Sequence, residues 1–205
     1  MKIIKEACVE TEKQAEIAFR NGADRIELCG DLSVGGITPD FTAAAKLHRA
    51  LPIPVKVMVR PRGGDFVYSA AEFARVLEEI KLFKSIGIPE VVLGFLTAEN
   101  KIDVAKTKRA VAAAMPMRVT FHKAIDDTPD IIAAVKTLKN IPGITSILSS
   151  GGRVSAIEGV KVLVEMKAEC GEKLTLIAAG KISPQVLPDL VQMLGAGEYH
   201  GRRIV

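Results

Sequence analysis

Two short segments near the start of the chain each carry a glutamate and a cysteine two residues apart. Glu6 and Cys8 end the strand-like run at residues 3–8, and Glu27 and Cys29 end the next such run. Because alternate side chains of a strand share one face, each pair places a carboxylate and a thiol on the same side. Carboxylates transfer protons, and thiolates suit a soft metal ion such as Cu(I). The candidate site is therefore the place where these two segments lie side by side.

The thiols have a second explanation, because a buried cysteine also packs as a small apolar residue. Neighbouring strands would bring Cys8 and Cys29 close enough for a disulfide or a shared ligand. Neither belongs to a Cys-x-x-Cys loop, and two cysteines are fewer ligands than a structural zinc site uses. From the residues alone, metal binding and apolar packing both stay open.

Two histidines close later strand-like segments. His122 follows residues 118–121, and His200 ends residues 198–200. Either imidazole could act as a general acid or base near neutral pH, and His122 could also ligate a metal. A hydrogen-bonded structural role is the alternative for both.

The longest polar stretch without helical periodicity is residues 60–69. It places Arg60, Arg62 and Asp65 around two glycines. Guanidinium groups bind anion oxygens, and glycines allow the backbone to approach closely, so this loop predicts an anion site. The alternative is that Arg60 forms a structural ion pair with one of the two glutamates above.

Glycine-rich turns follow two late strand-like segments, at residues 149–152 and 179–183. The second contains Gly180. Barrel proteins commonly bind phosphate with such late turns, through backbone amides and a helix N-terminus. A glycine-rich turn can also be no more than a turn.

Short β-rich runs alternate with longer helical runs along the chain. The strands are expected at residues 3–8, 25–28, 55–59, 91–94, 118–121, 146–148, 174–177 and 198–200. The helices are expected at residues 12–20, 41–50, 70–85, 104–114, 131–139, 156–169 and 184–193.

Strict alternation of this kind implies a parallel sheet with helical crossovers. Eight strands in this order predict an α/β fold, a (β/α)8 TIM-type barrel, with residues 1–205 as a single domain. The Gly-x-Gly-x-x-Gly turn of an open doubly wound sheet is absent. No helical segment follows the last strand, so we expect the eighth helix to be absent or truncated. A second subunit would then cover that side, or an apolar groove would stay open.

The polar residues at the strand ends alternate with apolar ones. The apolar set can pack under the helices, so the polar set points into the barrel. In a barrel the chemistry lies at the carboxyl ends of the strands, which is where these residues fall. Charges in an interior that small apolar residues usually fill imply a pocket, a network or both.

Composition excludes several classes of protein. The 205 residues carry a net charge of +4 that is spread along the chain, with no Trp and two Tyr, which argues against a nucleic-acid surface. No apolar run approaches a membrane span, and the first residues do not form a signal peptide. Three cysteines, an odd number, fit a reducing compartment, so a cytoplasmic location is expected.

Several motifs are similar to those of the CutC family, whose members are called copper homeostasis proteins. They lie at residues 6–10, 22–29, 35–39, 60–69 and 120–124, and the match runs to about residue 200. The resemblance implies a (β/α)8-type barrel, a cytoplasmic homodimer or higher homo-oligomer, and a role in handling copper. Cys8 and Cys29 match the family's proposed Cu(I) ligands.

Three functions are compatible with these patterns. The first is a Cu(I)-binding protein that uses the two thiols. The second is an enzyme for a small anionic substrate, such as a phosphorylated one, with Glu6, Glu27 and His122 as acid–base residues. The residues expected to bind the anion are Arg60, Arg62, Asp65, Gly180 and His200. The third is a barrel whose inner charges are architectural and whose function lies at a partner interface.

Overall fold

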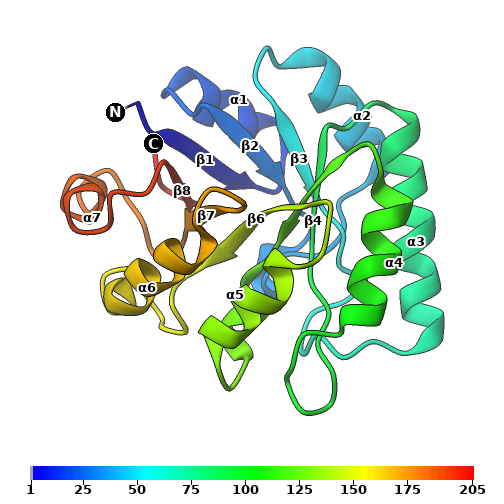
Figure 1. The fold of residues 1–205 in the computed structure, drawn as a ribbon. Coiled ribbons are helices and arrows are strands. Elements are labelled where there is room, and N and C mark those ends of the chain that lie inside the picture. The colour runs from blue at the N-terminus through cyan, green and yellow to red at the C-terminus, as the bar shows by residue number, and fades with distance from the viewer. Residues whose placement is uncertain (1) are drawn as a thin grey trace.

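Eight parallel strands close into a barrel in the computed structural model of the chain, which describes residues 2–205 (Figure 1). The strands follow one another around the ring in chain order, and β1 pairs with β8 to close it. The strands are β1 (Ile4–Val9), β2 (Arg25–Leu28), β3 (Val55–Met58), β4 (Glu90–Leu93), β5 (Arg118–Phe121), β6 (Ile144–Ser149), β7 (Thr175–Ala178) and β8 (Glu198–Gly201). The predicted barrel is confirmed, and an open doubly wound sheet is excluded.

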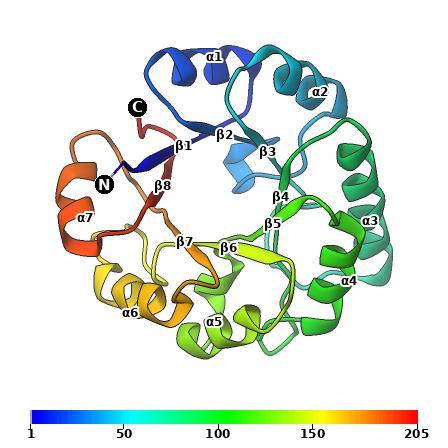
Figure 2. The same cartoon turned by 45° about the horizontal axis from the view of Figure 1, so that its top comes forward.

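The helices form an outer ring around the strands (Figure 2). They are α1 (Glu12–Arg20), α2 (Phe41–Ala50), α3 (Ala70–Ser85), α4 (Val104–Ala114), α5 (Ile131–Lys139), α6 (Val160–Cys170) and α7 (Leu187–Leu194), with short 3-10 helices η1 (Leu32–Val34) and η2 (Lys123–Asp127). Within residues 2–205 no helix follows β8, in line with the expected absence of an eighth helix. Both ends of the chain lie between α7 and α1 in Figure 2. None of the helices described here has the length and apolar character to cross a membrane.

Two helices begin later than the periodicity predicts. The helix α6 starts at Val160 rather than at residue 156, because the Ala156 amide donates to the carbonyl of Gly180 and ties this segment to the loop after β7. The helix α7 starts at Leu187 rather than at residue 184. Residues before it form a turn in which Val186 and Leu187 both donate to the carbonyl of Ser183.

The main core lies between the strands and the ring of helices. On β3, Val55 and Val57 are fully buried on the outer face, and Val91 and Leu93 of β4 are buried beside them. Apolar positions three and four residues apart along α3 pack onto this layer. The outer face of each strand is therefore used for packing, and the inner face is left for polar side chains.

The register of the strands places opposite charges next to one another inside the barrel. Glu6 of β1 lies opposite Arg25 of β2, and Lys56 of β3 lies opposite Glu90 of β4. Glu90 is in turn opposite Arg118 of β5. Directly opposed unlike charges stabilise neighbouring strands, so the inner face forms a charge network.

Candidate functional site

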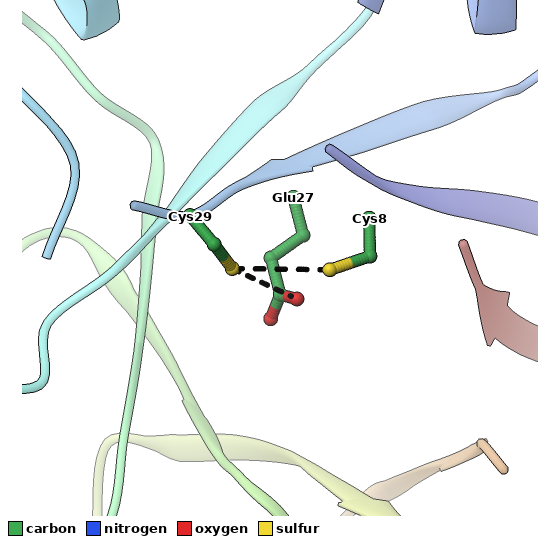
Figure 3. A group of neighbouring side chains, drawn as sticks. All are labelled: Cys8, Glu27 and Cys29. Atoms are coloured by element: carbon green, nitrogen blue, oxygen red, sulfur yellow. Dashed lines mark hydrogen bonds between the residues drawn. The ribbon is translucent and has the colours of Figure 1, made fainter. Parts of the chain in front are cut away.

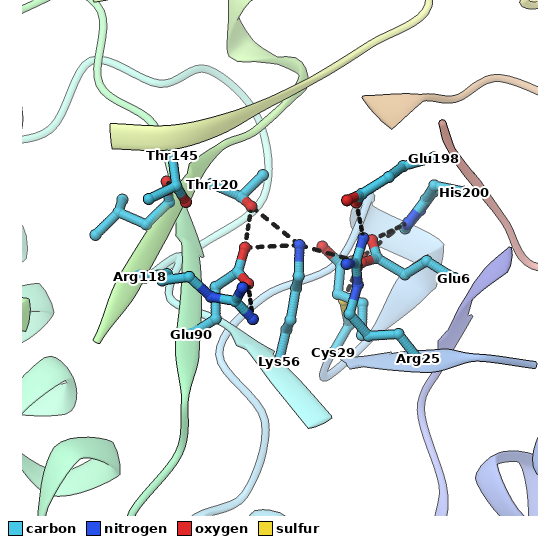
Figure 4. A network of polar contacts seen from close by, with 12 residues as sticks. Glu6, Arg25, Cys29, Lys56, Glu90, Arg118, Thr120, Thr145, Glu198 and His200 are labelled. Carbon is cyan, nitrogen blue, oxygen red and sulfur yellow. Dashed lines mark hydrogen bonds and ion pairs between the residues drawn. The ribbon is translucent and has the colours of Figure 1, made fainter. Parts of the chain in front are cut away.

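A network of charged side chains, most of them buried, lies among the strands of the barrel (Figure 4). Lys56, 1% exposed, lies 3.2 Å from a Glu6 carboxylate oxygen and 2.7 Å from a Glu90 carboxylate oxygen. Arg25 bridges Glu6 and Glu198, and Arg118 lies 3.3 Å from Glu90. Three carboxylates thus face three cations, and their charges balance.

Glu6 is ionised inside this network. Burial alone would raise the pKa of its carboxyl group, but the charges of Lys56 and Arg25 and a hydrogen bond with His200 bring the pKa well below its usual value. One Glu6 oxygen faces the two cations, and the other lies 2.8 Å from His200 Nδ1. The side chain predicted to be an acid or base therefore has both oxygens engaged and holds the His200 ring in position.

His200 connects the charge network to the thiols above it. Its Nδ1 contacts Glu6, and its Nε2 lies 3.6 Å from a Glu27 oxygen. Burial alone would lower the pKa of His200, but Glu27, Cys8 and Glu6 raise the pKa well above its usual value. The predicted anion ligand is therefore a cationic side chain surrounded by acidic groups.

The two predicted thiol ligands point toward each other beside Glu27 (Figure 3). Cys8 lies opposite Glu27 in the β1–β2 register, and Cys29 is the next inward residue after Glu27. The two Sγ atoms are 3.8 Å apart, and Cys29 Sγ lies 3.6 Å from a Glu27 oxygen. Both cysteines are free thiols, so the structure places a dithiol here and not a disulfide.

These three side chains share their protons unequally. The hydrogen bond from Cys29 holds the pKa of the Cys8 thiol well below its ordinary value, and the same bond raises the pKa of Cys29. Burial raises the pKa of Glu27 to about 8. Of the two thiols, Cys8 is therefore the one favoured to ionise, beside a carboxyl group whose pKa is raised to about 8.

A cavity of about 610 Å³ opens above the thiols at the carboxyl ends of the strands. Cys8, Glu27 and Cys29 lie at its inner end, and loops after β3, β5, β7 and β8 contribute its walls. A volume of this size accommodates a small organic ligand. The interior expected to hold a pocket, a network or both therefore holds both, and His200 belongs to each.

Arg60 does not pair with Glu6 or Glu27, so the structural ion pair considered for it is wrong. Its guanidinium group donates to the carbonyl oxygens of Val34 (3.2 Å), Gly36 (3.0 Å) and Gly64 (2.7 Å). The ring of Phe66 lies 4.7 Å from the guanidinium carbon. Arg60 is only 5% exposed and lines the cavity, and the ion pair expected of it is made by Arg25.

Arg62 and Asp65 lie outside the cavity wall. Arg62 pairs with Asp65 at 2.9 Å and with Glu72 at 2.6 Å, and it stacks over Tyr68. Asp65 also accepts a hydrogen bond from the Val67 amide. The structure does not bring these two predicted ligands together with Arg60, and it gives them contacts that shape their own loop.

His122 is buried at the end of β5, where its ring lies 4.8 Å from that of Phe66. Its Nδ1 accepts a hydrogen bond from the Ala124 amide, and its Nε2 has no protein partner. Burial and the nearby charge of Arg60 lower the pKa of His122 to about 3. The ring is therefore neutral, carries its proton on Nε2, and forms part of the cavity lining, with Nε2 itself buried.

Gly180 also lines the cavity, in the turn after β7. Its φ angle is +108°, and an added Cβ would lie 2.9 Å from the side chain of Ser150. Glycine is therefore required at this close approach of two loops.

The network residues Arg25, Glu90 and Arg118 were not among the sequence-based candidates. Arg25 stands two positions before Glu27 on the same strand, so the alternation that singled out Glu27 also marks Arg25. Glu90 precedes the predicted start of β4 by one residue, and extending that strand backwards would have placed Glu90 on the inner face.

Comparison with known proteins agrees with this architecture. The model of the CutC family matches residues 3–205. The chain belongs to the CutC family. A relative named CutC from Klebsiella pneumoniae is 39% identical over 195 residues, which cover 95% of this chain and 78% of that protein.

Solved structures support the same assignment. The crystal structure of a candidate copper homeostasis protein CutC from Streptococcus agalactiae superposes with a TM-score of 0.94 at 29% identity, covering 99% of this chain and all of that one. Phosphoribosyl anthranilate isomerase from Thermococcus kodakaraensis has a TM-score of 0.61 at 15% identity, covering 98% of this chain and 87% of that one. The second likeness concerns the barrel fold alone.

Proposed function

We propose that this CutC-family chain takes part in copper homeostasis by binding Cu(I) through Cys8 and Cys29. The observation that carries the proposal is the 3.8 Å separation of their two Sγ atoms at the inner end of an open cavity. Two sulfur atoms that each bond one tetrahedral ion at about 2.3 Å stand about 3.8 Å apart, so the thiols suit a shared soft ion.

The surroundings of the thiols favour this role. Cys8 already has thiolate character, and the thiolate is the form that binds a metal. Glu27 offers a third ligand atom, because the ligand atoms of Cys8, Glu27 and Cys29 all lie within 4.8 Å of one another. Met58 packs beside the two cysteines and adds a polarizable thioether to the same pocket.

An anaerobic Cu(I) titration against a chromophoric competitor tests the proposal. The variant with Cys8→Ser and Cys29→Ser should lose more than about tenfold in Cu(I) affinity. Cys170→Ser is the matched control, because Cys170 is equally buried but packs in the outer core on α6. Wild-type affinity equal to that of the double variant would refute Cu(I) binding at this site, and a preference for Zn²⁺ would refute the choice of metal.

We further propose that the protein works in the cytoplasm as a homodimer or higher homo-oligomer. All three cysteines are free, which fits a reducing compartment. Sedimentation equilibrium at micromolar concentration tests the oligomeric state, and a single monomeric species would contradict it.

An enzyme for a small anionic substrate is a second candidate function. It is favoured by Glu27, whose pKa of about 8 lets it donate or accept a proton near neutral pH at the inner end of the cavity. The neutral His122 could donate a hydrogen bond to a substrate oxygen from the adjacent wall. Conversion of small phosphorylated and carboxylated compounds, followed by proton NMR, should be lost in Glu27→Gln and kept in Glu16→Gln on the surface of α1. A wild-type protein that converts none of them would contradict this candidate.

A further inference from the structure

The cavity carries an excess of positive charge at its mouth. Its cationic lining residues are Arg60, Lys123, Lys181, Arg202 and Arg203. Glu27 is the one carboxylate among the described residues that line it, and it lies at the inner end with Cys8, Cys29 and His200. The outer part of the lining, as far as the structure describes it, therefore carries arginine and lysine side chains and no carboxylate.

Three of these cations have no carboxylate partner in the described part of the chain, whereas Lys123 lies 3.6 Å from Asp126 and Arg202 donates to the carbonyl of Leu32. Among residues 2–205, no carboxylate pairs with Arg60, Lys181 or Arg203. Arg60 is the most telling, because it is buried, contacts only carbonyl oxygens through its terminal nitrogens, and leaves its Nε without a partner. A buried cation is costly unless an anion accompanies it, so this wall favours an anionic ligand.

The turn after β7 adds backbone donors on the side of the cavity across from Arg60, because β3 and β7 are four strands apart in the ring. Residues 180–183 all line the cavity, and their amides donate to no other group among the described residues. Gly180 and Lys181 have φ angles of +108° and +52°. A non-glycine residue rarely adopts such a conformation, and consecutive unpaired amides in a tight turn form an anion-binding concavity.

We infer that the turn after β7 is a phosphate site, and that the cavity takes a small phosphate monoester. The phosphate group would lie against the amides of residues 180–183, between the side chains of Lys181 and Arg203. The organic part would extend past Met58 and Phe66 toward Glu27, which the volume of about 610 Å³ allows. The inference names a substrate class for the second candidate function, and it rests on that function only where turnover is concerned. Binding of the phosphate monoester requires neither that enzymatic activity nor copper.

The test is calorimetric titration with glycerol 3-phosphate at low ionic strength. Wild-type protein should bind it saturably at millimolar concentration and should bind neither glycerol nor malonate with comparable affinity. The variant Lys181→Gln with Arg203→Gln should bind at least about tenfold more weakly, since it loses two charge-assisted contacts. Both side chains are exposed, so the variant should keep the wild-type melting temperature.

A second double variant controls for net charge. Arg49→Gln with Lys173→Gln removes the same two charges at the opposite end of the barrel, and it should bind glycerol 3-phosphate like the wild type. The inference is overturned if wild-type protein does not bind the probe, if malonate binds equally well, or if both double variants lose affinity to the same extent. Cu(I) affinity of Lys181→Gln with Arg203→Gln should be unchanged, so a failure here is distinguishable from a failure of the copper proposal.

Discussion

His122 is fixed as a neutral hydrogen-bond donor by two contacts of its ring. The amide of Ala124 occupies Nδ1, and the ring of Phe66 covers one face. Because Gly94 has no side chain, the imidazole can pack directly against its backbone; an added Cβ would lie 2.5 Å from the ring. The ring can therefore direct a proton on Nε2 toward an oxygen atom without ever becoming charged.

The low pKa of His122 makes folding stability depend on pH. The pKa is about 3 in the folded protein and about 6.5 in the unfolded chain, so the unfolded chain binds more protons between these values. Stability therefore rises with pH across this window and is lost as the pH falls. Because of His122 alone, the free energy of unfolding should fall by about 2 kcal/mol between pH 7 and pH 5.

Urea denaturation of His122→Gln at pH 7 and pH 5 measures this contribution. The variant should lose less stability on acidification than the wild type, by about 2 kcal/mol. The same substitution at His48 on α2 serves as the control and should leave the pH dependence unchanged. If His122→Gln and the wild type lost the same stability between pH 7 and pH 5, the buried ring would not be the cause of the acid sensitivity.

At the scale of elements, the start of α3 organises the arginine-rich loop. Ser69 caps the helix by accepting from the Glu72 amide at 3.2 Å, and Glu72 accepts from the Ser69 amide at 2.7 Å. The same Glu72 carboxylate accepts from Arg62 at 2.6 Å. The capping box therefore ties residues 60–69, which carry Arg60, to a rigid helix.

Loss of the cap should weaken the helix measurably. Ser69→Ala should cost about 1 kcal/mol in the free energy of unfolding, the usual value for a serine N-cap. Ser85→Ala, at the other end of α3, removes an exposed hydroxyl that bonds only the preceding turn and should cost less than about 0.5 kcal/mol. Guanidinium denaturation of both variants gives the comparison, and equal costs would argue against the capping role.

Periodicity and strand parity predict the barrel and the inner faces of its strands, but not the ion-pair partners or the cavity. The alternation of runs identifies the barrel, and the two-residue spacing identifies the inner faces that carry Glu27 and His200. Parity cannot choose between Arg25 and Arg60 as the partner of Glu6, because both are inward cations on neighbouring strands. Only the register of the closed sheet decides that, and it places Arg25 directly opposite Glu6. The cavity itself depends on loop conformations that no periodic pattern encodes.

At the scale of the whole molecule, the buried network joins most of the strands through their charges. Lys56 stands between Glu6 and Glu90, and its ammonium group also donates to Thr120 at 3.1 Å. Removing one member leaves an opposite charge buried without compensation, which costs more than the pair itself contributes.

Lys56→Met should therefore destabilise the protein by about 3–5 kcal/mol. Lys56→Met leaves the carboxylates of Glu6 and Glu90 without their shared cation. Adding Glu90→Gln removes one of these two charges, so that the remaining network has two carboxylates and two cations. The double variant should be destabilised less than the sum of the single variants, with a coupling of at least about 0.5 kcal/mol. Additive effects in a double-mutant cycle measured by denaturation would show that the two charges act independently.

The seam between β1 and β8 has a consequence for the order of folding. It joins Glu6 to His200, which are 194 positions apart in the chain. Contacts of such long range pay a large entropic cost of closure and form late, whereas β1 and β2 are neighbours in the chain and can pair early. On the ribosome, the dithiol is therefore made well before the imidazole that lies beneath it. During synthesis the two thiols are therefore present before His200 can pack beneath them. At that stage the barrel does not protect them from oxidants, so any protection has to come from the cell.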